Sequence, residues 1–275
     1  MLLAISLFSI MQMLVKEMSN IPFYELIFFR AILSVIICYA SIKKQGLNLW
    51  GNDKKTLIAR ALFGCFSLCC FFYATQNLPY GSVITIVNIK PFLVLLWATI
   101  FLGEKTRAFQ WAFFGLSLAG IVWLKFEDSR LDTLPLVATI GAAVFASGAY
   151  TMLRKLRNTD KPVVILFYFT FVTLPIVLPF TITGWVMPQG IEWLWCLLIG
   201  LLTHFAQLAM TKAYQLAPVG IVSNFYYLGI VFAFIFGYWI FEETYTLKQI
   251  YAVILIVGGI ALNVFFSFRN SKATT

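Results

Sequence analysis

Residues 76–104 read QNLPYGSVITIVNIKPFLVLLWATIFLGE, and residues 215–243 read QLAPVGIVSNFYYLGIVFAFIFGYWIFEE. A shift of 139 residues places the first stretch on the second without a gap. The shift aligns Pro, Gly, Glu and Gln residues as well as interchangeable apolar ones. It places Pro79 on Pro218, Gly81 on Gly220, Glu104 on Glu243, Gln110 on Gln249 and Gly120 on Gly259. We interpret this match as the duplication of one structural unit.

The composition indicates a membrane protein. Hydrophobic residues make up 61% of the 275 residues and charged residues only 11%, whereas soluble globular domains contain about 25% charged residues. A helix that spans the bilayer needs about 20 apolar residues. Ten segments qualify, at residues 1–16, 24–42, 57–76, 80–102, 108–125, 133–153, 163–183, 193–214, 218–241 and 247–267. The predicted fold is an all-α membrane protein with ten transmembrane helices.

Ten helices and one duplication predict two repeats of five helices each. The first repeat is expected to cover residues 1–127 and the second residues 128–275, within one integrated transmembrane domain. Because five is an odd number, the two repeats must enter the membrane from opposite sides. Inverted repeats of this kind are a recurrent basis of secondary transporters, whose halves rock about a site near the middle of the bilayer.

The distribution of Lys and Arg predicts the orientation in the membrane. The formal net charge is +9, and cations in short loops favour the cytoplasmic side. With the N-terminus inside, 13 Lys and Arg residues face the cytoplasm and 4 face the other side, and Arg60 counts among the 13. We expect a multi-pass protein of the cell (inner) membrane with both termini in the cytoplasm. No basic face with interleaved aromatic residues points to a nucleic acid.

Sequence signatures of cofactors and enzymes are absent. The five cysteines lie inside apolar runs, without a CxxC pair or a metal-ligand spacing to the single histidine, so neither a metal nor another cofactor is expected. The sequence also lacks GxSxG, HExxH and P-loop motifs. These absences argue against an enzyme and against primary active transport. The apolar run Met1–Val15 has no basic region before it and no A-x-A site after it, which favours a first membrane helix over a signal peptide.

Three motifs of the sequence are informative together: residues 28–30 (FFR), residues 88–92 (NIKPF) with 102–104 (LGE), and residues 146–150 (ASGAY) with 153–155 (LRK). They resemble, in this order, the second-helix arginine pattern, the fourth-helix proline with its terminal Gly-Glu, and the start of the second half in the drug/metabolite transporter superfamily, in its EamA-like branch. The resemblance covers essentially the whole chain. It implies an inverted-repeat fold in which the fifth and tenth helices sit apart and the others surround a central cavity. It also implies export or exchange of small metabolites.

The chain departs from the family pattern at three positions, which leaves the substrate open. Phe169 stands where the repeat would place a partner of Arg30, Glu242 stands where the first repeat has Gly103, and Lys90 precedes Pro91, where a small or apolar residue is expected.

Lys90 lies near the middle of the fourth predicted helix. A charge at that depth is costly and normally faces a cavity. One interpretation is a cation in the central cavity that attracts an anionic substrate or, once desolvated, carries a proton. The other is a lysine paired with a backbone carbonyl or with a carboxylate such as Glu17 or Glu25. For Arg30, likewise, a structural role and substrate contact are both open.

The eighth predicted helix carries polar residues at His204, Gln207, Thr211 and Gln215, a spacing that indicates one helix face. Four hydrogen-bonding groups on one face favour contact with water or a ligand. The unperturbed pKa of histidine is near 6.5, so His204 is a candidate for proton coupling. A histidine held by a neighbouring helix is the alternative.

The repeat also pairs polar residues of the fourth and ninth predicted helices. Thr85 and Asn88 fall on Asn224 and Tyr227, as expected for a pseudo-symmetric central site. Asn88 and Lys90 are two residues apart, or about 200° around a regular helix. We therefore expect one of these two side chains to lie at a seam between helices.

The sequence as a whole predicts a secondary transporter for a small polar solute, anionic or zwitterionic, bound between helices 3, 4, 8 and 9. The expected substrate-binding residues are Lys90, Asn88, His204, Gln207, Thr211, Asn224 and Tyr227. Export by proton antiport or by solute exchange is expected, from a monomer or homodimer whose partners are the solute, the lipid bilayer and, for antiport, protons. The alternatives are an integral-membrane enzyme and a membrane sensor or scaffold that does not transport.

Overall fold

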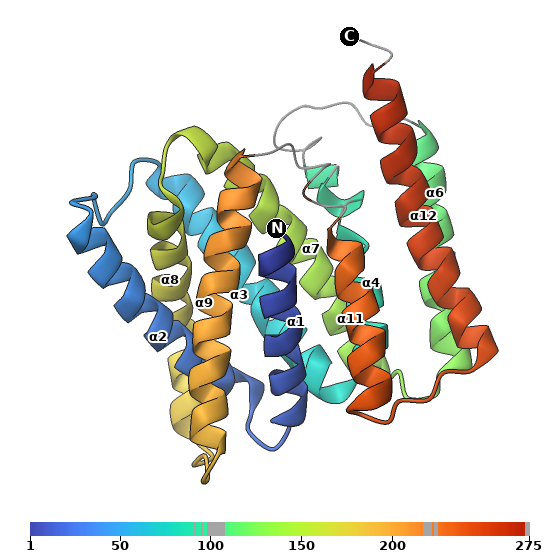
Figure 1. Ribbon diagram of the computed structural model, residues 1–275, viewed down its shortest axis with the longest axis horizontal. Helices are drawn as coiled ribbons and strands as arrows, with labels where there is room; N and C mark the ends of the chain where they lie inside the picture. Colours follow the sequence, from blue (N-terminus) through green and yellow to red (C-terminus); the bar gives the residue numbers. More distant parts are fainter. Residues whose placement is uncertain (91, 95, 98–107, 217–221, 223–224, 273–275) are drawn as a thin grey trace.

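The chain folds into a bundle of helices (Figure 1). The computed structural model describes residues 1–275 except 91, 95, 98–107, 217–221, 223–224 and 273–275. Within this part there are ten α-helices, one short 3-10 helix (η1) and no strand. The helices are α1 (Leu2–Glu17), α2 (Phe23–Lys44), α3 (Lys54–Asn77), α4 (Tyr80–Val87), α6 (Ala108–Glu127), α7 (Thr133–Lys155), η1 (Leu156–Asn158), α8 (Pro162–Thr183), α9 (Glu192–Leu216), α11 (Tyr226–Trp239) and α12 (Leu247–Lys272). Each α-helix overlaps one predicted segment, which confirms the all-α fold.

The helix ends follow from local chemistry. At the start of α3, the Asp53 carboxylate accepts hydrogen bonds from the backbone N–H of Thr56 (3.1 Å) and from its hydroxyl (2.6 Å), as a capping residue does. The hydroxyl hydrogen bond lowers the pKa of Asp53 below its usual value. At the start of α8, Pro162 occupies the first turn, where its missing N–H would have no helical partner in any case.

Five helices are long and apolar enough to cross a membrane: α2, α3, α7 with η1, α8 and α9. Shorter apolar stretches lie in α4, α11 and α12. Large apolar side chains are exposed on the outside of the bundle, among them Phe126, Ile182 and Trp239. An exterior of this kind is costly in water but suits contact with lipid.

The most extensive packing joins helices of the first repeat to helices of the second. The contact of α1 with α9 is the repeat equivalent of the contact of α3 with α7, and both are large. The pairs α2 with α8, α4 with α11 and α6 with α12 each bring equivalent helices together. Figure 1 shows α6 and α12 side by side at one end, apart from the other helices. The arrangement is the one that the family resemblance implies.

The crossing of α6 and α12 is symmetric at the level of atoms. The Ser117 hydroxyl donates to the Ile256 carbonyl (3.1 Å), and these two positions are 139 residues apart. A Cβ on Gly120 would lie 2.9 Å from the Ala252 carbonyl oxygen, and one on Gly259 would lie 2.8 Å from the equivalent oxygen of Phe113. The glycines therefore let the two backbones approach closely, as small residues do in membrane helix pairs.

The two halves also share a contact at their helix ends. Gln76, at the end of α3, donates its amide to the Ile21 carbonyl (2.8 Å), and Gln215, at the end of α9, donates to the Asp160 carbonyl (3.0 Å). Both the donors and the acceptors are 139 residues apart. The first bond holds the turn between α1 and α2, and the second holds the turn between α7 and α8.

We expect Gly259→Ala to destabilise the protein and Gly258→Ala, its neighbour, to leave stability almost unchanged. The Cβ added at Gly259 would overlap Ser117 and the Phe113 carbonyl, whereas no atom lies within 4 Å of one added at Gly258. Overpacking of this kind costs roughly 1–3 kcal/mol. Thermal unfolding in detergent, followed by tryptophan fluorescence, measures the difference. Equal melting temperatures for the two variants would contradict the close crossing.

Candidate functional site

A central cavity of about 130 Å³ lies in the middle of the bundle. Its walls come from α1, α2, α3, α4, α7, α8, α9 and α11, whereas no residue of α6 or α12 is among its described lining. Both halves of the duplicated chain therefore contribute to one cavity. Its position fits the prediction of a site at the interface of the repeats.

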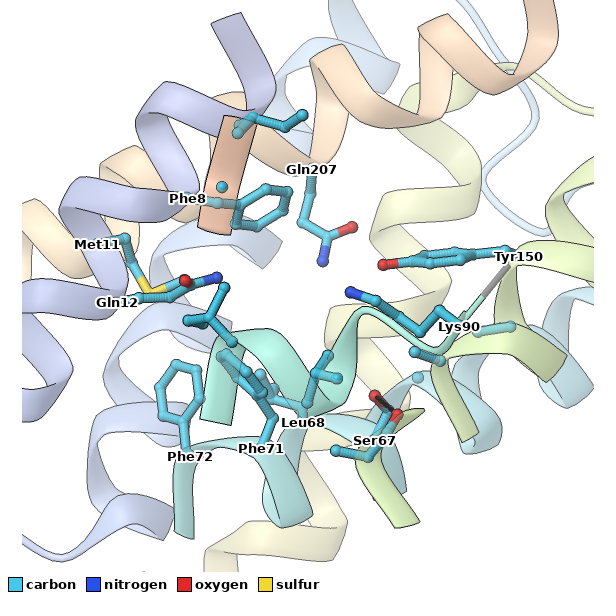
Figure 2. A pocket seen from close by; sticks show the side chains of 18 of the residues that line it. Phe8, Met11, Gln12, Ser67, Leu68, Phe71, Phe72, Lys90, Tyr150 and Gln207 are labelled. Atoms are coloured by element: carbon cyan, nitrogen blue, oxygen red, sulfur yellow. Dashed lines mark hydrogen bonds between the residues drawn. The ribbon is translucent and has the colours of Figure 1, made fainter. Parts of the chain in front are cut away.

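Three of the predicted site residues meet at this cavity. Lys90, Asn88 and Gln207 line it, and Figure 2 shows the Lys90 amine and the Gln207 amide pointing into the same space. Asn224 lies outside the described residues. Tyr227 belongs to the first turn of α11, but its side chain lies outside the described part.

Asn88 and Lys90 both line the cavity, contrary to the expectation that one would lie at a seam. The expectation assumed a regular helix over residues 80–102, but α4 ends at Val87, and Asn88 and Ile89 form a turn before helical geometry resumes at Lys90. Pro91 follows directly; a proline has no N–H to donate to the carbonyl four residues earlier, here that of Val87, and its ring would clash with that carbonyl in a regular helix. The turn changes the angle between the two side chains.

The four polar residues of α9 do not all face the cavity. His204 is buried, with Nδ1 3.3 Å from the Ser34 hydroxyl of α2, so it lies at a seam between two helices. Thr211 is buried and is not among the cavity lining, and Gln215 holds Asp160 as described above. Of the four residues, Gln207 alone is among the described residues that line the cavity.

Arg60 lines the cavity, although the count of loop charges placed it in the cytoplasm. It lies in the second turn of α3 and is only 2% exposed. Its guanidinium carbon lies 4.6 Å from the centre of the Phe169 ring. The placement of Arg60 in a cytoplasmic loop is therefore wrong. Its position inside the predicted segment 57–76 was the signal that could have revealed it.

Arg30 also lines the cavity and lies near the same aromatic ring. Its guanidinium carbon lies 5.7 Å from the ring centres of both Phe72 and Phe169. Phe169 is the repeat equivalent of Arg30. The residue that departs from the family pattern therefore contacts the residue at the equivalent position of the first repeat. Cation–π contacts of this kind hold a guanidinium in an apolar setting.

Several polar atoms that face this region have no hydrogen-bond partner among the described residues. They are Nε and Nη1 of Arg60, the Asn88 carbonyl oxygen and the Gln207 carbonyl oxygen. Lys90 Nζ lies 5.9 Å from the centre of the Tyr150 ring. Figure 2 places Gln12 opposite Lys90 and Tyr150, with Phe71 and Phe72 forming an apolar wall. A buried polar group without a partner is costly, so a polar ligand or water would be stabilised here.

The cavity is strongly cationic in its lining. Lys90, Arg30 and Arg60 contribute positive charge, and no Asp or Glu is among the described lining residues. In the described part of the chain, no three His, Cys, Asp or Glu side chains gather as a metal site would require. The arrangement is suited to holding an anionic group.

Comparison with known proteins assigns this architecture to a family. The chain matches the EamA-like transporter family over residues 1–126 and 133–265. It belongs to the EamA-like transporter family. A relative, the pseudopaline exporter CntI of Pseudomonas aeruginosa, is 31% identical over 262 residues, which cover 93% of this chain and 92% of that protein.

More distant matches agree with this assignment. The EamA-like chain is 28% identical to solute carrier family 35 member G1 of Mus musculus, over 87% of this chain and 70% of that protein. A solved crystal structure that is 19% identical has the same fold, with a TM-score of 0.71 over 97% of this chain and 96% of the other. The predicted membership of the drug/metabolite transporter superfamily, with its ten-helix, two-repeat fold, is confirmed.

A second polar cluster of the EamA-like chain, which we call the clamp, holds the turn between α3 and α4. The Glu243 carboxylate accepts hydrogen bonds from the backbone N–H groups of Tyr80 (2.5 Å) and Gly81 (3.3 Å), at the start of α4. The Tyr245 hydroxyl donates to the same carboxylate (2.5 Å), and Lys16 Nζ donates to the Leu78 carbonyl (2.6 Å). Burial, together with the bond to Glu243, raises the pKa of Tyr245, so this hydroxyl keeps its proton.

In the clamp, Glu243 caps the start of α4. A carboxylate at a helix N-terminus is stabilised by the free N–H groups and by the helix dipole. Glu243 belongs to the second repeat and α4 to the first, so the clamp joins the halves. Glu104, the repeat equivalent, lies outside the described residues.

Glu242 precedes the clamp and adopts a backbone φ of +50°. This left-handed conformation is unfavourable for side chains other than glycine, by roughly 1–2 kcal/mol. The first repeat has Gly103 at the equivalent position. The departure from the family's Gly-Glu pair therefore places a strained residue beside Glu243.

We expect Glu242→Gly to stabilise the protein by about 1 kcal/mol, because glycine adopts positive φ readily. Glu242→Ala removes the same charge but keeps the strain, so it should show no such gain. Thermal unfolding of the purified variants in detergent compares them. If alanine and glycine raised the melting temperature equally, charge rather than backbone strain would be the cause.

Proposed function

We propose that this transporter is a secondary carrier for a small anionic or zwitterionic metabolite of the cell (inner) membrane. The observation that carries this proposal is the cationic lining of a cavity between two inverted halves. Rocking of the halves would expose the cavity to each side in turn. The P. aeruginosa relative is named an exporter, which favours export, driven by proton antiport or by exchange for another solute.

Lys90 is assigned the electrostatic attraction of the substrate. Its amine and the amide of Gln207 point into the same space. Asn88 belongs to the turn that directly precedes Lys90. The unpartnered carbonyl oxygens of Asn88 and Gln207 would accept hydrogen bonds from donor groups of the substrate. A zwitterion has an anionic group for the cations and a donor group for these oxygens, whereas a simple anion would bind to the cations alone.

The remaining site residues stay predictions from the sequence. Asn224 and Tyr227 keep this role through their equivalence to Thr85 and Asn88. His204 and Thr211 are assigned a supporting role behind Gln207, with His204 between α2 and α9 as the candidate for proton coupling. The repeats are assigned to residues 1–127 and 128–275, with both termini in the cytoplasm.

Lys90→Ala should lower transport of the anionic substrate by about tenfold or more. Hydrogen bonds to charged groups contribute about 1.5–3 kcal/mol, and 1.4 kcal/mol corresponds to about tenfold in binding. Everted membrane vesicles with a mixture of small metabolites, analysed by mass spectrometry with and without a pH gradient, measure the rates. Lys212→Ala, which removes an exposed lysine of α9, is the matched control.

Two results of this experiment would overturn the proposal. If no solute moved in wild-type vesicles, the chain would not be a carrier under these conditions and the sensor or scaffold alternative would gain. If Lys90→Ala carried every anionic solute as wild type does, the site would not depend on this cation. An effect of the pH gradient on the wild-type rate would favour proton antiport over solute exchange.

We propose further that the clamp closes one end of the cavity during the transport cycle. Its bonds join Glu243 of one half to the α3–α4 turn of the other, so rocking apart at this end requires breaking them. The nearby Arg130 side chain donates to the Thr244 carbonyl (3.2 Å) and binds Asp128 (2.9 Å). These contacts hold the loop that carries Glu243.

Glu243→Gln should loosen this end, because a neutral amide binds the N–H groups of α4 less strongly than a carboxylate. The measurement is the labelling rate of Leu78→Cys, a buried position within the clamped turn, by a membrane-impermeant maleimide. We expect labelling several times faster with Glu243→Gln than without it. Glu127→Gln, which removes a partly exposed partner of Lys248, serves as the control. Unchanged labelling would mean that the clamp does not close the cavity.

A further inference from the structure

We propose that the substrate is a small dianion and that Arg60 sets this charge preference. The inference rests on the proposed function and narrows its substrate class. A dicarboxylate and a phosphomonoester share the required chemistry, which is two negative charges on a small molecule. A cavity of about 130 Å³ limits the substrate to that size range.

The described lining of the cavity has a net positive charge. Arg30 and Arg60 carry guanidinium groups, which stay protonated in proteins, and Lys90 adds an amine. No carboxylate is among the described lining residues. Buried charges are normally paired, because desolvation without a partner is costly. A substrate with two negative charges would balance more of this positive charge than a substrate with one.

Both arginines of the cavity lie near aromatic rings. Arg30 lies between two aromatic rings, with its guanidinium carbon 5.7 Å from the centres of Phe72 and Phe169. Arg60 contacts the Phe169 ring but has two nitrogen atoms, Nε and Nη1, without a hydrogen-bond partner among the described residues. Arg60 therefore has donors left for a ligand.

The chain packs closely around the Arg60 side chain. Gly64 lies one turn further along α3, and a Cβ there would overlap Arg60 Nη1 and lie 2.8 Å from the Phe169 ring. A glycine at this position leaves room for the guanidinium beside the ring. With an exposed fraction of 2%, Arg60 cannot reach bulk water as a surface cation does. The site holds a buried donor in a fixed position.

Arg60 and Lys90 both line the cavity. Lys90 Nζ lies 5.9 Å from the centre of the Tyr150 ring, and Tyr150 lines the same cavity as Arg60. The two cations come from different segments, α3 and the stretch after α4. Two acidic groups of one substrate, or a single doubly charged phosphate, would bind both.

The test uses the full-length protein and four probes of similar size. Butyrate carries one negative charge, 4-aminobutyrate is a zwitterion, and glutarate and methyl phosphate are dianions at pH 8. Binding is measured by ligand-induced thermal stabilisation in detergent, and transport by uptake of radiolabelled probe into proteoliposomes. We expect wild type to prefer one of the dianions over butyrate by about tenfold or more, the range that one charge-assisted bond supplies. Which dianion is preferred distinguishes a carboxylate from a phosphate substrate.

The variants assign the preference to Arg60. Arg60→Gln should bring the dianion and butyrate to within about twofold, while Arg60→Lys should keep most of the preference, since it retains the charge. Arg154→Gln, an exposed arginine one turn beyond Tyr150, is the control and should behave as wild type. If Arg60→Gln does not fold, Arg60→Lys and the wild-type order of probes still decide.

The inference and the function on which it rests fail in different ways. If wild type binds butyrate or 4-aminobutyrate as well as it binds the dianions, the dianion inference is wrong but an anion or zwitterion carrier remains. If Arg60→Gln keeps the full dianion preference, Arg60 does not set it. If no probe binds and the metabolite screen in vesicles also finds no transported solute, the proposed function itself fails.

Discussion

The low polarity of the bilayer is the constraint on which the rest of this structure depends. Backbone N–H and C=O groups have no water to bind there, so the spanning segments must be helices. Polar side chains must likewise turn inward and find partners. The partners in this chain are carbonyl groups, hydroxyl groups and aromatic rings. Among the described residues, most of the buried polar atoms without a hydrogen-bond partner belong to Arg60, Asn88 and Gln207, which line the cavity where the two halves meet.

The repeat could be recognised from the sequence because it preserves residues whose backbone roles cannot be exchanged. Gly120 and Gly259 each sit where a Cβ would strike the neighbouring helix. Gln76 and Gln215 each hold a carbonyl of a turn. Such contacts need particular residue types at particular positions, whereas an apolar surface in lipid tolerates many. The fold was therefore predictable to the level of helix number, duplication and inversion.

The site was predictable only in part, and the errors have physical causes. Arg60 was counted as a loop charge because a linear count of cations cannot tell a helix end in water from the second turn of a helix inside the bundle. The spacing of His204 and Gln207 predicts one face of a regular helix, but α2 packs against α9 and covers His204. Asn88 and Lys90 diverge on a regular helix, and the turn before Pro91 brings both to the cavity. Each of these outcomes depends on packing between segments far apart in the chain.

The charges of the cavity follow a different rule from its scaffold. Lys90, Arg60 and Arg30 all belong to the first repeat, and their equivalents in the second repeat are Gly229, Ile199 and Phe169. Duplicated cations would have doubled the positive charge in one small apolar space, at a large cost in desolvation. Neutral equivalents avoid that cost, and Phe169 also provides a ring against which both arginines pack. The scaffold can thus remain symmetric, while the three cations that line the cavity belong to one half.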